Sequence, residues 1–465
     1  MVGDDDGTLI DDRELTASEV ADETADDSDG AVESDSGGDI GEIPDTADGA
    51  DGTTPPTDPV AIFGRKYWEV YRPHFLAEHY DHGRVCDRIT NGLKWFGDNT
   101  LWMSYALSLF VYEYRAAHLD DSLAHIDEIL AAYAELDAMP ANPTLGYLVA
   151  DPLDGYVYRS DRGPDYETNW CIAAGGLCLP QTGARNNEPS GDQMLATLRG
   201  LSDVARTPEP LVWQGRDLKA LAAAHGQRLG EYLVRDRYQM KNILGDAVKR
   251  GDDQRWASWA FERGAALVSG MPQSHFETTW FLPGNIPVAP AQHEVIGQYF
   301  LRYAMRFSSS CVGGQAIDLQ TLIGVPLTVT IACNEFNVGL AGDGAVIASD
   351  TDPASARWFS TIVDRADIID EGNALYAMYA RYVFGDRDPG LYETAKGFLS
   401  APATPPTGAN LDPNGWCVAW RWGKDDDRPD RCSALSDPLT TYTGLDYLLP
   451  RAMASAFGDL PPEDR

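Results

Sequence analysis

Two stretches of this chain begin an apolar helical pattern with nearly the same residues. The first reads GDNTL from Gly97, and the second reads GDQML from Gly191. Each has glycine, aspartate, a carboxamide, a variable residue and leucine in the same order. Looser copies begin at Glu371 (EGNALYAMYARYVFG) and at Tyr442 (YTGLDYLLPRAM). Repetition of this kind predicts a ring of stacked helical hairpins whose inner helices all begin on the same side.

The spacing of the apolar residues predicts a mainly α-helical fold between residues 61 and 465. Aliphatic and aromatic residues recur three and four positions apart, which places them on one face of a helix. Helices are predicted at 98–117, 121–138, 191–206, 216–236, 254–269, 292–307, 354–369, 371–384, 388–399 and 440–457. The predicted architecture is an (α/α) toroid of sequential helical hairpins.

Other segments depart from this pattern. A first helix over 64–80 is predicted to break at Pro73, because proline has no N–H and its ring clashes with the preceding turn. Alternating residues around Gly-Tyr-Val-Tyr predict a small β insertion at 145–160. Long loops are predicted at 161–190 and 401–437, and the stretch 312–350, rich in glycine, valine and threonine, fits no single class.

The first 60 residues are predicted to form a separate acidic arm. They contain 20 acidic residues, a single base, Arg13, and little that is aromatic. Such a segment cannot bury enough apolar surface to offset the entropy lost on ordering. The chain is therefore predicted to divide into a disordered arm, residues 1–60, and one toroid-like domain, residues 61–465. The arm either tethers the protein to a partner or is a solvated tail.

The charge balance predicts the environment of the protein and argues against one class of partner. The formal net charge is −36, acidic residues outnumber basic ones 72 to 36, and only 7 of the bases are lysines. Salt screens the repulsion among dense carboxylates, so this composition predicts a halophilic, haloarchaeal host. The sequence contains no basic patch, which argues against nucleic-acid binding.

Targeting and cysteine patterns predict neither a membrane span nor a metal site. The N-terminus lacks the positive region and apolar run of a signal peptide, and no run of about 18 uncharged apolar residues predicts a span. We expect a cytoplasmic protein or a component of a larger assembly. The seven cysteines form no CxxC pair, so free thiols are favoured over zinc ligands or a disulfide such as Cys417–Cys432. No cofactor is predicted.

The aspartates of the two closest copies, Asp98 and Asp192, have two interpretations. Asp, Asn and Thr are good N-cap residues worth about 1 kcal/mol each, and an acid favours a helix N-terminus. In a ring of hairpins, however, the same positions surround a common funnel. Two carboxylates that face one substrate can hydrolyse a glycosidic bond, provided that the funnel raises the pKa of one and leaves the other low.

At these residues the chain resembles the six-hairpin glycosidase superfamily. The segments GDNTLWMSYALSLF, SGDQMLATLRGLSDV and YTGLDYLLPRAM carry the resemblance, which spans about residues 65–457 as a layout. The layout is similar to that of unsaturated glucuronyl hydrolases and rhamnogalacturonyl hydrolases, in which aspartates at inner-helix starts supply the acid/base chemistry. The resemblance implies Asp192 as general acid/base and Asp98 as its partner, acting on an acidic or decorated saccharide.

Aromatic residues in predicted loops add candidate sugar contacts. The apolar faces of sugars stack on indole rings, although the same rings can instead anchor loops by burial. Arg421 can pair with a uronate carboxylate or with neighbouring aspartates. The predicted substrate-binding residues are Trp170, Gln193, Trp280, Trp416, Trp420, Arg421 and Trp422.

Two other functions stay open at this point. The toroid can be a non-catalytic glycan-binding or structural component of a cell-surface or virion assembly, with the acidic arm as its tether. It can also be a polysaccharide lyase or a sugar epimerase. In that case His275 or His293 would take part in proton abstraction, together with Glu277 or Tyr299.

Overall fold

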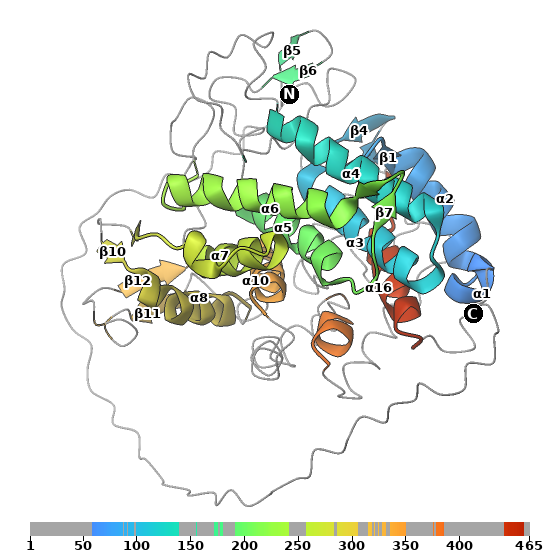
Figure 1. Cartoon of the computed structure of the whole chain (residues 1–465). Coiled ribbons are helices and arrows are strands. Elements are labelled where there is room, and N and C mark those ends of the chain that lie inside the picture. The colour runs from blue at the N-terminus through green and yellow to red at the C-terminus, as the bar shows by residue number, and fades with distance from the viewer. Residues whose placement is uncertain are drawn as a thin grey trace, which may run out of the picture. The chain divides into compact units, whose positions relative to one another are not determined.

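The computed structural model confirms the mainly helical class of the fold (Figure 1). All residues that it describes belong to the unit Thr54–Arg465. They are residues 58–86, 88–90, 92–96, 99–138, 155, 172–174, 177–179, 191–240, 257–282, 286–305, 315–318, 320, 324, 328–331, 335–349, 375, 378–385 and 441–459. The predicted helices at 354–369 and 388–399 lie outside these ranges, as do the acidic arm up to residue 57 and all of the predicted β insertion except Gly155.

The described chain begins with a helical run that precedes the first long helix. Its segments are α1 (Pro59–Phe63), η1 (Lys66–Tyr71), α2 (Arg72–His74) and η2 (Phe75–His79). The prediction that Pro73 interrupts this run is wrong. On both sides of α2 the turns are π-helical, and the N–H of Arg72 bonds to the carbonyl of Tyr67, five residues earlier. The wider turns accommodate the proline, whose missing N–H would leave a gap in a regular α-helix.

Short strands bring the starts of two long helices together. The hairpin β1 (Tyr80–Asp81) with β2 (Arg84–Val85) is followed by an antiparallel sheet in the order β13 (Thr441–Tyr442), β3 (Arg88–Thr90), β4 (Leu93–Trp95). The helix α3 (Asn99–Ala117) follows β4, and α16 (Leu445–Ala456) follows β13. The predicted helix start at residue 440 is therefore wrong, because residues 441 and 442 pair with β3 instead.

The other long helices are α4 (Asp120–Ala138), α5 (Gly191–Arg206), α6 (Leu218–Arg235), α7 (Ser258–Ser269), α8 (Pro290–Met305) and α10 (Glu335–Ala348). All but α10 match predicted helices to within a few residues. The helix α10 lies in the stretch that fitted no class, after the hairpin β11 (Gln315–Asp318) with β12 (Thr328–Ile331). The remaining short elements are β5 (Ile172–Ala174), β6 (Leu177–Leu179), β7 (Val212–Trp213), β8 (Arg216–Asp217), η6 (Gln273–His275), β9 (Trp280–Leu282), β10 (Ile286–Val288) and η7 (Tyr379–Val383).

Side-chain contacts show that several long helices run parallel. Near the starts of α3 and α5 Thr100 donates a hydrogen bond to Gln193, and near their ends Tyr112 donates one to Asp203. Other segments repeat this order, early residue with early residue and late with late. The pairs are Asp343–Arg199 and Ser349–Arg206 for α10 and α5, Tyr379–Asp203 and Phe384–Arg206 for residues 378–385 and α5, and Phe457–Tyr112 at the ends of α16 and α3.

The helices α4, α6 and α8 and the N-terminal run point in the opposite direction to these, whereas α7, antiparallel to α6 and α8, shares the direction of α3 and α5. Contacts in reversed order are Ser122–Glu113 and Tyr133–Thr100 for α4 and α3, Gly226–Val268 and Gly230–Ala265 for α6 and α7, Glu262–His293 and Trp259–Gly297 for α7 and α8, and Tyr67–Glu113 and Phe75–Phe110 for the N-terminal run and α3. The helix α6 keeps the direction of α4, through Arg216–Asp127 and Arg228–Asp137. Sequential antiparallel hairpins are therefore present, as predicted.

One buried apolar cluster joins these elements. It contains side chains from the N-terminal run, from α3 to α8, from α10, from residues 375–384 and from α16. In the part of the chain that the structure describes, no helix has the length and hydropathy of a membrane span.

Gly200 marks a close approach of α5 to α3. A Cβ atom at this position would lie 2.7 Å from the carbonyl oxygen of Ser104. Gly200→Val is therefore expected to lower the free energy of unfolding by about 1–3 kcal/mol, because the two helices must move apart. Ala131→Val, on an exposed position of α4, changes helix propensity without a clash and should cost at most about 0.7 kcal/mol. Urea unfolding of both variants measures the difference, and equal losses would contradict the close contact.

Candidate functional site

The structure describes three of the nine residues predicted to form a site. Asp192 and Gln193 lie in the first turn of α5, and Trp280 is the first residue of β9. The other predicted site residues, Asp98, Trp170, Trp416, Trp420, Arg421 and Trp422, lie outside the described residues. The described part of the candidate site therefore consists of the first turns of the parallel helices and the polar residues that follow them.

Buried polar side chains tie the starts of α3 and α5 together. The hydroxyl of Thr100 donates to Oε1 of Gln193 at 2.5 Å, and both residues are at most 3% exposed. The carbonyl of Thr100 also accepts a hydrogen bond from Tyr133 of α4 at 3.1 Å. The carboxamide predicted to contact a sugar thus has its oxygen engaged between two helices. The described residues of the first copy, Asn99–Leu101, thus lie beside the second copy.

Asp192 shares one face of α5 with Arg199 and Asp203. The three residues are separated by seven and by four positions, intervals that return to nearly the same face of an α-helix. At 1.5 Å per residue, Asp192 lies about 10 Å along the helix axis from Arg199. Arg199 and Asp203 are buried, whereas Asp192 is partly exposed. Asp192 therefore stands at the N-terminal end of a stripe whose other members face the interior.

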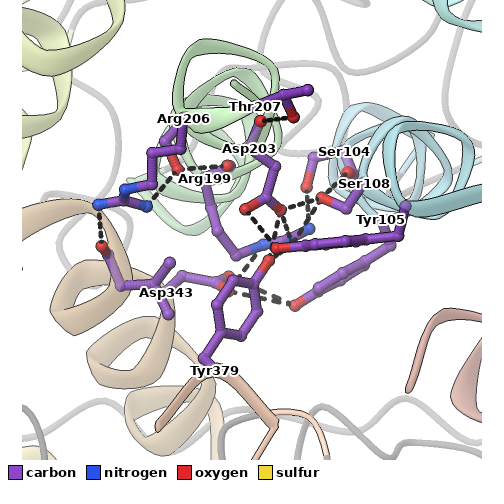
Figure 2. A network of polar contacts seen from close by, with 12 residues as sticks. Ser104, Tyr105, Ser108, Arg199, Asp203, Arg206, Thr207, Asp343 and Tyr379 are labelled. Carbon is purple, nitrogen blue, oxygen red and sulfur yellow. Dashed lines mark hydrogen bonds and ion pairs between the residues drawn. The ribbon is translucent and has the colours of Figure 1, made fainter. Parts of the chain in front are cut away.

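Two turns along α5 from Asp192, the guanidinium of Arg199 is the centre of a buried polar network (Figure 2). Its Nε lies 3.2 Å from Asp343 of α10, and its other nitrogens donate to Ser104 at 2.7 Å, Ser108 at 3.0 Å and Tyr379 at 2.8 Å. Asp203 accepts from the hydroxyls of Ser108 at 2.6 Å, Tyr112 at 3.1 Å and Tyr379 at 2.5 Å. We call these residues the Arg199 cluster: Ser104, Tyr105, Ser108, Tyr112, Arg199, Asp203, Asp343 and Tyr379.

The charges of the Arg199 cluster favour a permanently ionised guanidinium. Burial opposes the charged form of Arg199, but the facing Tyr379 and the two carboxylates outweigh it, so the pKa of Arg199 is raised. Burial also raises the pKa of Tyr379, which keeps its hydroxyl protonated and able to donate. All members of the cluster are at most 2% exposed. The cluster therefore ties α3, α5, α10 and Tyr379 together in the interior.

Asp446 is a functional candidate that was not predicted as a site residue, although the fourth copy of the repeated start contains it. It lies in the first turn of α16, and it is 6% exposed. Its Oδ1 accepts the N–H of Tyr447 at 3.1 Å. Burial raises the pKa of Asp446 to about 7, and the N–H of Tyr447 acts in the opposite direction. The carboxyl therefore keeps its proton over the mildly acidic range, as a general acid must.

The end of α16 that is remote from Asp446 contacts α3 and residues 378–385. Phe457 follows the last residue of α16, and it is 36% exposed. Its ring centroid is 6.4 Å from that of Tyr112 in α3 and 4.9 Å from that of Tyr382. Tyr112 belongs to the Arg199 cluster. The C-terminal end of α16 thus packs against one tyrosine of the Arg199 cluster.

Trp280 is fully buried beside His293, with their ring centroids 5.9 Å apart. Its Nε1 has no hydrogen-bond partner within the described residues. This placement agrees with the interpretation in which an indole anchors a loop, here the β9–β10 hairpin. In this position the ring offers no exposed face for stacking on a sugar.

The two histidines considered for proton abstraction pair with acids of different helices. Nε2 of His275 lies 2.9 Å from Glu231 of α6, and both side chains are partly exposed. Nδ1 of His293 lies 2.5 Å from Glu262 of α7, and both are buried. Neither of these acids belongs to a repeated helix start. Among the described residues, no group of three or more His, Cys, Asp or Glu side chains is placed to hold a metal ion.

Removal of the Arg199 guanidinium is expected to be costly. Arg199→Met leaves Asp203 and Asp343 buried without a cation, so the free energy of unfolding should fall by about 3–5 kcal/mol. Arg65→Met is the matched control, because the paired side chains of Arg65 and Glu69 are 80% and 52% exposed. The control should lose at most about 1 kcal/mol. Denaturant unfolding in one salt concentration compares the two, and similar losses would contradict the central role of Arg199.

Asp446→Asn is expected to change how stability depends on pH. A carboxyl whose pKa rises from 3.8 to about 7 on folding stabilises the fold below pH 4. This contribution is lost as the pH rises through 7. Between about pH 4 and 8 the wild type should therefore lose stability relative to Asp446→Asn, by on the order of 4 kcal/mol. Unfolding midpoints across this range measure the effect, and parallel profiles would argue against a buried, protonated Asp446.

Comparisons with known proteins add no family to these observations. No family model, no curated protein and no solved structure matches this chain. The resemblance to six-hairpin glycosidases therefore rests on the sequence pattern alone.

Proposed function

We propose that this chain is a glycoside hydrolase built on an (α/α)6 toroid, with its active site at the first turns of the inner helices. The directions of the helices support the toroid. We assign the segments that run parallel, α16, α3, α5, α7, α10 and 378–385, to the inner ring. We assign α4, α6, α8 and the N-terminal run, which are antiparallel to them, to the outer ring. In such a ring the inner helices begin around one shared opening.

The contrast between Asp192 and Asp446 carries the catalytic part of the proposal. Asp192 is partly exposed, whereas Asp446 is buried and has its pKa raised to about 7. Glycosidic hydrolysis needs one protonated carboxyl for the leaving oxygen and one carboxylate that activates water or stabilises the cation. We assign the first role to Asp446 and the second to Asp192. Asp98, one residue before α3, is the partner of Asp192 that the sequence pattern predicts.

An acidic or decorated saccharide is the proposed substrate class. The resemblance implies such a substrate, and the helix directions give it a physical basis. Helix N-termini carry partial positive charge and unpaired N–H groups that favour anions. Several parallel helices that begin on one side add these dipoles at the same end. This end can therefore attract a uronate even though the chain as a whole carries a net charge of −36.

A non-catalytic glycan-binding or structural toroid is the second candidate. The burial of two predicted sugar contacts favours its structural form, because Gln193 is 3% exposed and Trp280 is fully buried, so neither is open to a sugar. A module of this kind would keep its helix-start opening for recognition and would need no acid with a raised pKa. The acidic arm would then tether the module to an assembly.

Turnover by an Asp192→Asn variant tests the proposed hydrolase. On a panel of acidic and neutral polysaccharides in molar salt, kcat should fall by about 10²–10⁴-fold, because the ionised carboxylate is lost. Asp217→Asn is the matched control. Asp217 also starts a helix, where it caps α6 by accepting the N–H groups of Lys219 and Ala220. Asparagine caps equally well, so the control should keep full activity.

The two candidate functions give different outcomes in this experiment. Loss of turnover in Asp192→Asn with unchanged unfolding supports the hydrolase. A wild-type protein that binds a glycan of the panel but turns over none of them would support the non-catalytic module.

A further inference from the structure

A histidine and a glutamate are buried against each other between α7 and α8. Nδ1 of His293, in the first turn of α8, lies 2.5 Å from Oε1 of Glu262 in α7, and both side chains are at most 1% exposed. Nε2 of the same ring lies 3.3 Å from the carbonyl oxygen of Val288, the last residue of β10. The imidazole therefore joins α7, α8 and the β9–β10 hairpin.

These two contacts determine how many protons the pair holds. A carbonyl oxygen only accepts hydrogen bonds, so Nε2 of His293 must carry a hydrogen to bond to Val288. Nδ1 then faces Glu262 with either a lone pair or an N–H. One proton between Nδ1 and Oε1 satisfies both atoms, whichever of them holds it. Without this proton the imidazole keeps a single N–H, which can bond to Glu262 or to Val288 but not to both, so one of the two contacts is lost.

The immediate surroundings offer Glu262 little help once it is ionised. Its Oε2 is buried and has no hydrogen-bond partner within the described residues. Glu277, which follows η6, acts on Glu262 with a like charge. Tyr238, which follows α6, donates its hydroxyl to the carbonyl of Phe276 and not to Glu262. Burial is the largest cause that raises the pKa of Glu262 to about 7, and His293 acts in the opposite direction.

The other helices packed on α7 bring no compensating charge to the pair in the described residues. The helix α10 meets α7 at Gly264, where the neighbouring side chain is the apolar Ile347. The charged residues of α5, Arg199 and Asp203, are engaged in the Arg199 cluster. The state of the pair therefore depends on its own proton.

We propose that Glu262 and His293 form a proton-dependent brace that fixes α8 and the β9–β10 hairpin to α7. With one proton, the brace is closed. Release of the proton to solvent leaves one imidazole N–H for two acceptors, Glu262 and the Val288 carbonyl, so one of the two contacts is lost and the brace opens. Opening releases a proton, because the carboxyl binds it more weakly when exposed. Rising pH between about 5 and 7 therefore favours the open form, and the effect levels off above that range.

Hydrogen exchange of the full chain tests the brace. In molar NaCl, the backbone amides of residues 286–298 should lose protection by about ten-fold or more between pH 5 and 8, after correction for intrinsic exchange. The amides of α3 serve as an internal reference and should keep their protection. Constant protection of residues 286–298 in the wild type would overturn the proposal.

Glu262→Gln is the decisive variant, because its side-chain NH₂ donates to Nδ1 at every pH. Protection of residues 286–298 should then become independent of pH. Glu231→Gln is the matched control, since it removes the carboxylate of the exposed pair with His275 and should keep the wild-type profile. His293→Phe removes both contacts and should show low protection at all pH values. If protection of residues 286–298 in Glu262→Gln kept the pH dependence of the wild type, the proposed brace would be wrong.

Discussion

A buried guanidinium determines how the parallel helices of this protein stand beside one another. Arg199 is fully buried, and its partners come from α3, from α10 and from Tyr379, all distant from it in sequence. A buried ion network of this kind adds little net stability over a well-packed apolar core, but it is costly to leave incomplete. Any arrangement that separates these helices leaves a buried charge without a partner, so the network favours a single register of the helices. The ring of Tyr105, 4.0 Å from the guanidinium carbon, closes its remaining face.

A second buried ion pair fixes the N-terminal run in the same way. Arg72 bonds to Glu113 of α3 at 2.9 Å, and Glu113 also accepts from Tyr67 and Ser122. The run therefore packs along the end of α3 opposite to the first-turn residues. Together with the β13-β3-β4 sheet, this leaves the starts of α3 and α16 side by side. The Arg199 cluster fixes how far each helix is shifted along its neighbours. This register determines which first-turn residues lie next to one another, so the proposed site depends on contacts made far from it.

The sequence predicted elements well and their partners poorly. Helix periodicity placed α5 at residues 191–206, because an amphipathic face and a small polar start are local signals. The prediction that Pro73 breaks the first helix was wrong, because π-helical turns accommodate the proline. Whether such turns form depends on the packing of the run and not on the proline itself. The strand pairing of residues 441–442 with β3 joins opposite ends of the chain, which no local pattern reports.

For the candidate site, too, local features were predicted and contacts between distant segments were not. The repeated starts predicted that Asp192 and Gln193 begin a helix beside another copy, and the bond from Thr100 to Gln193 agrees. Asp446 was visible as part of the fourth copy, but its burial and raised pKa depend on neighbours such as Tyr71, which the sequence does not bring near it. The Arg199 cluster was not predicted at all. A serine, an arginine and a tyrosine on apolar helices give no sign of one another until the helices are packed.

Buried and exposed charges in this protein respond to different solution conditions. High salt, which the net charge of −36 predicts for the host, screens exposed carboxylates within a few ångströms but does not reach the Arg199 cluster. Asp446 and Glu262 respond to protons instead, because burial raises the pKa of each to about 7. Rising pH therefore removes the proposed acid and opens the α7–α8 brace over the same range. If activity needs both the protonated Asp446 and the closed brace, it falls with rising pH more steeply than the loss of a single proton allows.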